Sequence, residues 1–227
     1  MAKRILDCFA SDFESFTKED LLESIRKSEG RVIACETIGT VRPMLGDVTN
    51  AEFVSAMGAD ILLLNMFDVK NPVIQGLPDG KPEDTIRRLK QLTGRPIGIN
   101  LEPVNAGAEG ETDPLWKMSE GRRATLENAR LACSMGVDMI LLTGNPGMGV
   151  ANEAIEETLK LYRENLGDKL ILAAGKMHAA GVLKESAEQI ITKEDVKRFR
   201  KAGADILLFP APGTVPGITM ESVRELV

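Results

Sequence analysis

The sequence predicts an α/β protein with a parallel sheet, and within that class a TIM-type (βα)8 barrel in which about six βα units are present. One motif occurs three times, at residues 58–65, 136–143 and 203–210: a glycine, an aspartate two residues later, and then an apolar run. None of these runs alternates as a strand with one wet face would, so each is expected to be buried on both faces. The spacing between the copies corresponds to about two βα units.

The three strands expected in the first half of the chain each follow a helix with recognisable ends. Thr17, three residues before an acid, is typical of an N-cap. Asn50 is expected to cap the second helix, and Pro82 suits the first turn of the third. A glycine ends each helix, at Gly30, Gly58 and Gly94. The strands that follow are expected at residues 32–36, 61–65 and 96–101.

The second half is expected to continue the alternation. Residues 121–135 and 151–166 have helical patterns, and in the latter Ile155, Leu159 and Tyr162 share one face. Thr192-Lys-Glu-Asp195 has the same sequence as residues 17–20 and is expected to cap the next helix. The remaining elements are a fourth strand ending before Gly144, a fifth at 170–174, a sixth ending at Phe209, and a helix from Thr219.

We expect residues 1–227 to form a single, partial barrel domain. Eight units at this spacing need roughly 280–320 residues, within the usual barrel range, and the sequence stops at Val227 inside an expected helix. The hypothesis is therefore that two βα units are missing at the C-terminus; a chain that is intact would close as a homo-oligomer or form an open sheet. The Rossmann fingerprint does not follow the first strand, so no nucleotide cofactor is indicated.

The composition excludes several classes of partner. The net charge is −6 and only nine residues are aromatic (seven Phe, one Trp, one Tyr), so neither a basic patch nor a stacking platform for nucleic acid is expected. No apolar run approaches the ~20 residues of a membrane span. The N-terminus lacks a signal-peptide pattern, and three widely spaced cysteines are expected to be buried free thiols in the cytoplasm.

Polar side chains follow the expected strands, where the reacting groups of barrel enzymes stand. The candidates are Glu36, Asn65, Asp68, Asn100, Glu102, Thr143, Asn145, Lys176 and His178. Polar residues are also common after strands wherever the end of a barrel faces solvent. Each of these residues, taken singly, could therefore be a loop cap or an exposed polar residue. Glu36, Glu102, Lys176 and His178 are the candidate catalytic residues.

Lys176 follows an apolar strand, and desolvation there would free its amine for Schiff-base chemistry or proton transfer. Two other roles explain a lysine at this position equally well. Lys176 could form a structural ion pair with Glu36 or Glu102, or it could be a fixed charge that binds an anionic substrate. His178, the only histidine, suits acid–base work, although a lone histidine is also commonly a packing or capping residue.

Glu36, Asp68 and Glu102 could gather at one end of the first three strands. Carboxylates with a few waters hold Mg²⁺ in many proteins, so these three residues are the candidate metal ligands. No two of them share a local motif, and the alternative is three separate loop residues.

Two Gly-rich loops open helices and are candidate sites for phosphate or carboxylate, since backbone N–H groups at such turns bind anions. They contribute Asn145, Gly147 and Gly149 in one loop, and Gly213, Thr214 and Gly217 in the other, while Asn65 and Asn100 are further candidate substrate-binding residues. Tight βα turns also need Gly and Pro, which is the structural alternative.

Residues 36–39, 57–60, 175–178 and 211–219 resemble a bacterial family of barrel proteins of unknown function, often encoded near sugar-uptake phosphotransferase genes. Its members carry labels such as haloacid-dehalogenase-like hydrolase or phosphoenolpyruvate phosphonomutase-like. The first label fits poorly, because that fold needs an Asp-x-Asp motif and Asp7-Cys-Phe9 lacks the second aspartate. The second implies a barrel with an acid-held Mg²⁺. The resemblance carries over no catalytic residues.

The function expected is a lyase or isomerase acting on a small phosphorylated or carboxylated carbonyl compound of carbohydrate metabolism. The segment from Glu102 to Ser119 would close over the site. The alternatives are a metal-dependent hydrolase, which the single histidine disfavours, and a non-catalytic sugar-phosphate-binding protein.

Overall fold

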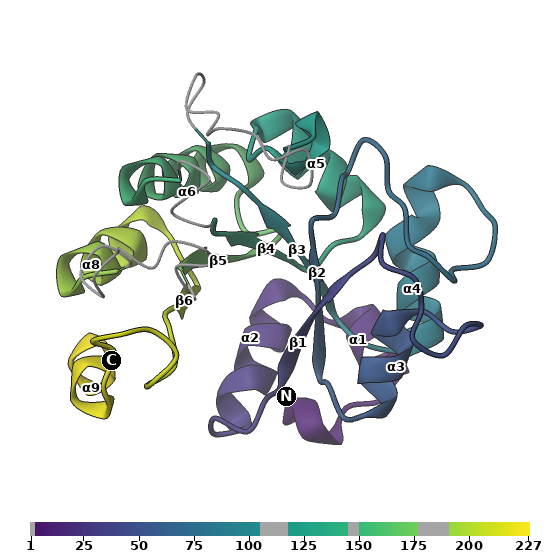
Figure 1. Cartoon of the computed structure of the whole chain (residues 1–227), viewed down its shortest axis with the longest axis horizontal. Coiled ribbons are helices and arrows are strands. Elements are labelled where there is room, and N and C mark those ends of the chain that lie inside the picture. The colour runs from purple at the N-terminus through teal and green to yellow at the C-terminus, as the bar shows by residue number, and fades with distance from the viewer. Residues whose placement is uncertain (1–2, 105–117, 145–149, 177–190) are drawn as a thin grey trace.

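Six parallel strands form one sheet in the order of the chain, in a computed structural model that describes residues 3–104, 118–144, 150–176 and 191–227. The strands curl into an incomplete barrel, with β1 and β6 at its two edges (Figure 1). The predicted fold class is therefore confirmed. The strands are β1 (Ala34–Ile38), β2 (Ile61–Asn65), β3 (Ile97–Leu101), β4 (Met139–Leu142), β5 (Ile171–Gly175) and β6 (Ile206–Leu208).

The helices alternate with the strands, and those of the outer layer surround the convex side of the sheet (Figure 1). The α-helices are α1 (Ala10–Ser15), α2 (Lys18–Lys27), α3 (Asn50–Ala56), α4 (Thr85–Thr93), α5 (Leu126–Met135), α6 (Asn152–Leu166), α8 (Lys193–Ala202) and α9 (Met220–Leu226). Short 3₁₀ turns lie at η1 (Ile5–Asp7), η2 (Pro82–Asp84) and η4 (Glu120–Arg122). The helix expected over 121–135 is thus a 3₁₀ turn followed by α5.

The helix caps follow the predicted chemistry with one correction. Thr17 and Thr192 both form capping boxes, in which the threonine hydroxyl accepts from the amide three residues on. The N-cap of α3 is Thr49 and not Asn50, because Glu52 completes a capping box with Thr49. The Asn50 side chain instead accepts a hydrogen bond from the Met44 amide at 2.9 Å.

Alternation along each strand divides the core into two layers. Residues such as Leu62, Ile99 and Ile140 face outward and pack against the surrounding helices. The inward-facing residues form a second apolar cluster, which α2 completes with Leu21 and Leu22. This cluster includes Ile61, Leu63, Met139, Leu141, Ile171 and Ala173.

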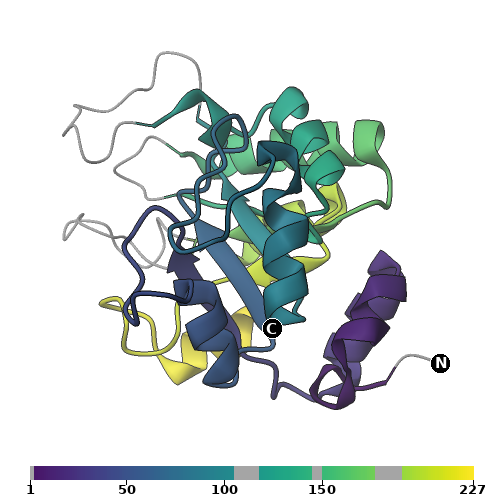
Figure 2. The same ribbon diagram turned by 90° about the vertical axis from the view of Figure 1, so that its right-hand side faces the viewer.

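Helix α2 closes the end of the barrel where the strands begin. It lies within the curve of the sheet in Figure 1, and Figure 2 shows it with α1 (both purple) apart from the outer helices. Lys18 fixes it there, since its ammonium group lies 3.0 Å from both Asp168 Oδ1 and Asp205 Oδ1. The N-terminal segment therefore joins the first and last strands of the incomplete ring.

The repeated aspartate explains the repeated motif. The amides of Asp60, Asp138 and Asp205 donate to the carbonyls of Ile33, Ile97 and Leu172 at 2.8, 2.9 and 2.8 Å, respectively. Each of those three residues returns a hydrogen bond from its own amide to the aspartate Oδ2, at 2.8 Å in every case. We call this two-bond unit the aspartate clamp. It ties the start of each even-numbered strand to the strand before it.

The three clamps differ in their cations. Asp138 Oδ1 accepts from Lys90 of α4 at 2.7 Å, and Asp205 is bound by Lys18 and by Arg163 of α6. Asp60 has no ion-pair partner among the described residues, although only 6% of it is exposed. The helix before β1 in the chain, α2, lies inside the curve of the sheet and not in the outer layer (Figure 1).

Strand β1 begins two residues later than the predicted 32–36, because Ile33 is engaged in the aspartate clamp with Asp60 and not in the ladder. The described cysteines are free, as expected, but only Cys8 is buried, while Cys35 and Cys133 are half-buried. In the described parts of the chain, no helix is long and apolar enough to cross a bilayer.

Candidate functional site

Three polar side chains occupy the inner face of the sheet just above its apolar layer. Glu36 lies on β1, Asn65 ends β2, and Asn100 lies on β3. Alternation places them on the face that carries Leu63 and Leu141 lower down. Because the strands are parallel, their C-terminal ends meet at one edge, which is where barrel enzymes place reacting groups.

The three side chains form one hydrogen-bond network, which we call the Glu36 cluster. Asn65 Nδ2 donates to Glu36 Oε1 at 2.7 Å, and Asn100 Nδ2 donates to Glu36 Oε2 at 3.4 Å. Asn100 Nδ2 also lies 3.2 Å from Asn65 Oδ1. Both oxygens of Glu36 therefore accept from amide groups, which fixes the orientation of the carboxylate.

The backbone after β2 holds Asn65 in place. Met66 has φ of 57°, a left-handed conformation uncommon for a residue other than glycine. In this conformation its amide donates to Asn65 Oδ1 at 2.8 Å. Strain of this kind is concentrated at functional sites in many proteins, and here it orients a side chain that touches Glu36.

Asn100 presents a buried acceptor without a partner. The residue is 6% exposed, and its Oδ1 is buried with no hydrogen-bond donor among the described residues. Turning the amide over would not help, because the oxygen would then face Glu36 and Asn65 Oδ1, which are both acceptors. An orphan acceptor of this kind costs free energy unless a ligand or water supplies a proton.

The residues at the C-terminal ends of the strands differ in exposure. Glu36 is exposed, so solvent reaches it, whereas Lys176 directly after β5 is only 4% exposed. Thr143, which follows β4, is 8% exposed. The predicted convergence of strand-end residues is thus supported for Glu36, Asn65 and Asn100, which contact one another, and Lys176 follows a strand at the same edge of the sheet.

Glu102 is engaged differently from the prediction. Its carboxylate forms an ion pair with Arg122, and both side chains are buried. Backbone bonds join the same residues, since the Glu102 amide donates to the Arg122 carbonyl at 2.9 Å. Glu102 is thus paired with Arg122 and not with Lys176, which was one of the two partners expected for that lysine. Arg122 was not predicted, because its partner lies far away in the sequence.

The three-carboxylate magnesium site is not formed. Asp68 Oδ1 accepts from the amides of Lys70 and Asn71 at 2.8 and 3.0 Å, and Glu102 is held by Arg122. No group of three His, Cys, Asp or Glu side chains that could hold a metal occurs within the described ranges. Glu36 alone of the three is not held by a backbone amide or an arginine of the described residues, so the predicted set of three ligands does not converge, and we derive no step through a metal ion.

One of the two Gly-rich loops is described. Within residues 211–218 the amides of Gly213 and Thr214 donate to the carbonyls of Ile218 and Ala211, and the Thr214 hydroxyl also donates to Ala211. The donors of Gly213 and Thr214 are therefore used inside the loop, and the predicted anion site, which includes Gly217, stays a prediction. Asn145, Gly147, Gly149 and His178, and most of the segment expected to close over the site, lie outside the described residues.

Comparison with solved structures identifies similar folds at low sequence identity. One is described as "Crystal structure of a putative lyase/mutase from Burkholderia cenocepacia J2315" (20% identity, TM-score 0.51, 92% of this chain and 70% of that chain). Another is 2,3-dimethylmalate lyase, a PEP mutase/isocitrate lyase superfamily member (11% identity, TM-score 0.51, 93% and 78%). At these identities the similarity establishes the fold alone.

The comparison with curated proteins gives no significant match. Neither similar structure supports the haloacid dehalogenase label. One family model matches nearly the whole chain, over residues 6–227. The chain therefore belongs to the family described as Domain of unknown function (DUF7916).

Proposed function

We propose that this protein is a lyase that cleaves or forms a carbon–carbon bond in a small carboxylated hydroxy or carbonyl compound, with Glu36 as the general base. The observation that carries the proposal is the Glu36 cluster, an oriented carboxylate beside a buried amide oxygen that lacks a donor. The proposal narrows the expected lyase or isomerase function to carboxylated substrates.

The two similar structures support the reaction class. One is named as a lyase for 2,3-dimethylmalate, which is a hydroxy dicarboxylate, and the other as a lyase or mutase. Fold similarity raises the prior for related chemistry without assigning it. The location of the Glu36 cluster at the C-terminal edge of the sheet agrees with where such folds place their sites.

The substrate hydroxyl is matched by the orphan acceptor. A hydroxyl carries one donor, which Glu36 or Asn100 Oδ1 can accept, and two lone pairs that accept from other groups. In the bound ground state the hydroxyl donates to the buried Asn100 oxygen, and it turns to Glu36 when its proton is removed, whereas a keto group would leave the Asn100 oxygen without a donor. The hydroxy form of a substrate should therefore bind more tightly than the keto form.

The chemical step needs a base and a cation. Glu36 removes the hydroxyl proton, the oxygen electrons form a C=O bond, and the neighbouring C–C bond breaks. Its electron pair moves to the carbon beside a carboxylate, which then takes up a proton, and the reverse sequence forms the bond. Lys176 is suited to bind the carboxylate that receives this charge, because a buried ammonium interacts strongly with an anion.

The test is a turnover assay on a panel of C4–C6 hydroxy diacids, with NMR detection of the released carbonyl and carboxylate products. The expected result is cleavage of at least one hydroxy diacid, reduced about 10²–10⁴-fold in Glu36→Gln, the usual contribution of a general base. Glu157→Gln, which removes an exposed carboxylate on α6, is the matched control and should retain activity.

Two results would contradict the proposal. Full turnover in Glu36→Gln would remove the carboxylate from the mechanism. Binding of the diacids without turnover, detected by calorimetry in the wild-type chain, would favour the non-catalytic binding protein. Borohydride trapping of a keto acid on Lys176 would replace simple charge stabilisation by Schiff-base chemistry.

A further inference from the structure

A cavity lies at the opposite end of the sheet from the Glu36 cluster. It has a volume of about 470 Å³ and opens between α1, the C-terminal end of α4, and the residues that lead into β3 and β4. This volume is within the range of small-ligand sites. The residues that matter for its chemistry are Phe13, Phe16, Arg87, Lys90, Arg95 and Val137.

One wall of the cavity is cationic. Lys90 is paired with Asp138 at 2.7 Å, and Arg87 lies 3.0 Å from Asp84 Oδ1. Arg95 differs, because this half-buried residue has no hydrogen-bond or ion-pair partner among the described residues. A guanidinium partly withdrawn from water without a counter-ion is a ready partner for a carboxylate, which it binds through two parallel hydrogen bonds.

Other residues that line the cavity are aromatic or apolar. The rings of Phe13 and Phe16 meet edge to face, with centroids 5.5 Å apart, and both residues are half-buried. Pro96 and Val137 continue this surface. Pockets that bind small molecules are commonly lined by aromatic side chains with a few charged or polar groups. The rings contact the flat, apolar part of the ligand, and a charged group fixes its orientation.

A smaller cavity of about 70 Å³ adjoins the first and shares Phe13, Phe16 and Val137 with it. It adds Lys18 and Lys169 to the surroundings. Lys18 is engaged by Asp168 and Asp205, while Lys169 is exposed. Five cations (Lys18, Arg87, Lys90, Arg95 and Lys169) and two anions (Glu14 and Asp138) line the two cavities, so the charge of the lining is positive on balance.

We propose that this cavity is a second binding site, which takes a small organic anion with a flat, apolar ring. The carboxylate of the ligand pairs with Arg95, and the ring lies against Phe13 and Phe16. The site is independent of the proposed lyase reaction, because it lies at the end of the sheet where the strands begin. It touches Asp138, whose clamp on Ile97 fixes the start of β3.

The test uses the full chain and three simple probes in NMR amide-shift titrations. Benzoate carries both ring and charge, benzamide only the ring, and acetate only the charge. Benzoate is expected to bind at one site with shifts at Phe13, Arg95 and Val137, and at least tenfold more tightly than either other probe. Arg95→Gln should weaken benzoate binding at least tenfold.

Two further variants separate a specific site from general charge. Arg200→Gln removes an exposed arginine from α8 and should leave benzoate affinity unchanged. Glu14→Gln removes the like charge and should tighten binding. Equal affinity in wild type and Arg95→Gln would overturn the proposal, and so would shifts at Phe13 and Arg95 that depend on protein concentration alone, which would identify an interface between copies.

Discussion

The carboxylate of Asp138 accepts a hydrogen bond from the amide of Ile97 at 2.8 Å, and the amide of Asp138 donates one to the carbonyl of Ile97 at 2.9 Å. Two bonds between the same pair of residues fix where one strand starts relative to its neighbour. A slip by one residue would turn every side chain to the other face of the sheet. The clamp thus protects the inward direction of Asn100.

Removing one clamp should destabilise the fold by an amount that depends on its cation. Asp138→Ala leaves the Ile97 amide without its acceptor and Lys90 without its anion, so a loss of about 2–4 kcal/mol is expected. Asp60→Ala removes an equivalent clamp that has no cation and should cost less. Urea denaturation of the variants measures both losses.

The control for this series is Asp79→Ala, which removes an exposed loop carboxylate and should be nearly neutral. A double-mutant cycle with Lys90→Ala isolates the ion pair from the backbone bond. Equal losses for Asp60→Ala and Asp138→Ala would show that the cations contribute nothing measurable.

Asn100 offers a test of function against stability. Its buried Oδ1 has no donor among the described residues, and Asn100→Leu removes this orphan together with the donations of Nδ2 to Glu36 and Asn65, so the free energy of unfolding should change by about 1 kcal/mol or less. The same variant should lose affinity for the hydroxy diacids. A large loss of stability, measured by thermal denaturation, would instead assign Asn100 a structural role.

Tyr162 provides a test of the core at alkaline pH. Its hydroxyl donates to the Thr125 carbonyl at 3.1 Å, and burial raises the pKa of this phenol above its ordinary value of about 10. The folded state then keeps its proton where the unfolded state releases it. The contribution to stability is complete below about pH 10 and is lost as pH rises above that value.

Tyr162 is the only tyrosine in the sequence, so the tyrosinate absorbance band reports this residue alone. During a pH titration, the band should appear together with the loss of far-UV circular dichroism. Tyr162→Phe should show a flatter dependence of stability on pH above about 10. Tyrosinate formation in a protein that is still folded would show that the phenol is accessible.

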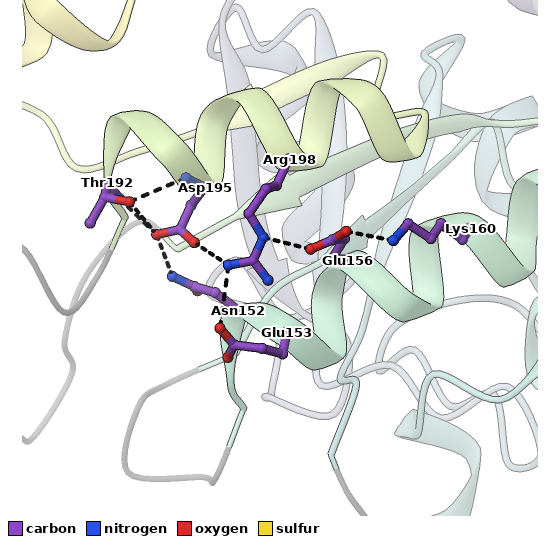
Figure 3. A network of polar contacts seen from close by, with 7 residues as sticks. All are labelled: Asn152, Glu153, Glu156, Lys160, Thr192, Asp195 and Arg198. Carbon is purple, nitrogen blue, oxygen red and sulfur yellow. Dashed lines mark hydrogen bonds and ion pairs between the residues drawn. The ribbon is translucent and has the colours of Figure 1, made fainter.

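A polar network joins α6 to α8, as Figure 3 shows. Arg198 donates to Glu156 at 2.6 Å and also lies within 3.3–3.4 Å of Glu153 and Asp195. Hydrogen bonds from Lys160 and then from Arg198 lower the pKa of Glu156 below its ordinary value. Because the folded carboxylate is the better acid, this contribution is present above the ordinary pKa and is lost as pH falls through the lowered one.

Arg198→Ala should therefore lower the urea midpoint modestly at pH 7, with an effect that shrinks toward pH 3 and at high salt. Arg200→Ala, on the same helix, is the matched control. The same shift of the midpoint at pH 3 and pH 7 would show that packing of the arginine stem, and not its charge, stabilises this contact.

The fold could be predicted because the repeated motif has one physical cause. An apolar run buried on both faces, preceded by a glycine and a clamping aspartate, gives a parallel strand wherever it occurs. The start of β1 was misplaced by two residues because Ile33 belongs to the clamp with Asp60, a contact that local pattern does not reveal. The predicted N-cap of α3 was also wrong by one residue. Asn50 is a common capping residue, but Thr49, directly before it, forms the capping box with Glu52.

The site could be predicted only in part. Glu36, Asn65 and Asn100 follow from strand order, because parallel strands bring their ends together. The partners of Glu102 and Asp68 do not follow, because Arg122 lies beyond a long connection and the acceptors in a turn depend on backbone angles. The contacts among Glu36, Asn65 and Asn100 agree with the expected convergence of strand ends, whereas the three carboxylates expected to hold a metal do not lie together among the described residues.

The position of Glu36 on an edge strand has a consequence for its chemistry. Strand β1 pairs with β2 on one side only within the described sheet, and Glu36 on this strand is exposed. Any strand that added to this edge would also dry the carboxylate and strengthen its interaction with a bound proton or cation. The reactivity of Glu36 therefore depends on what packs against the edge of β1.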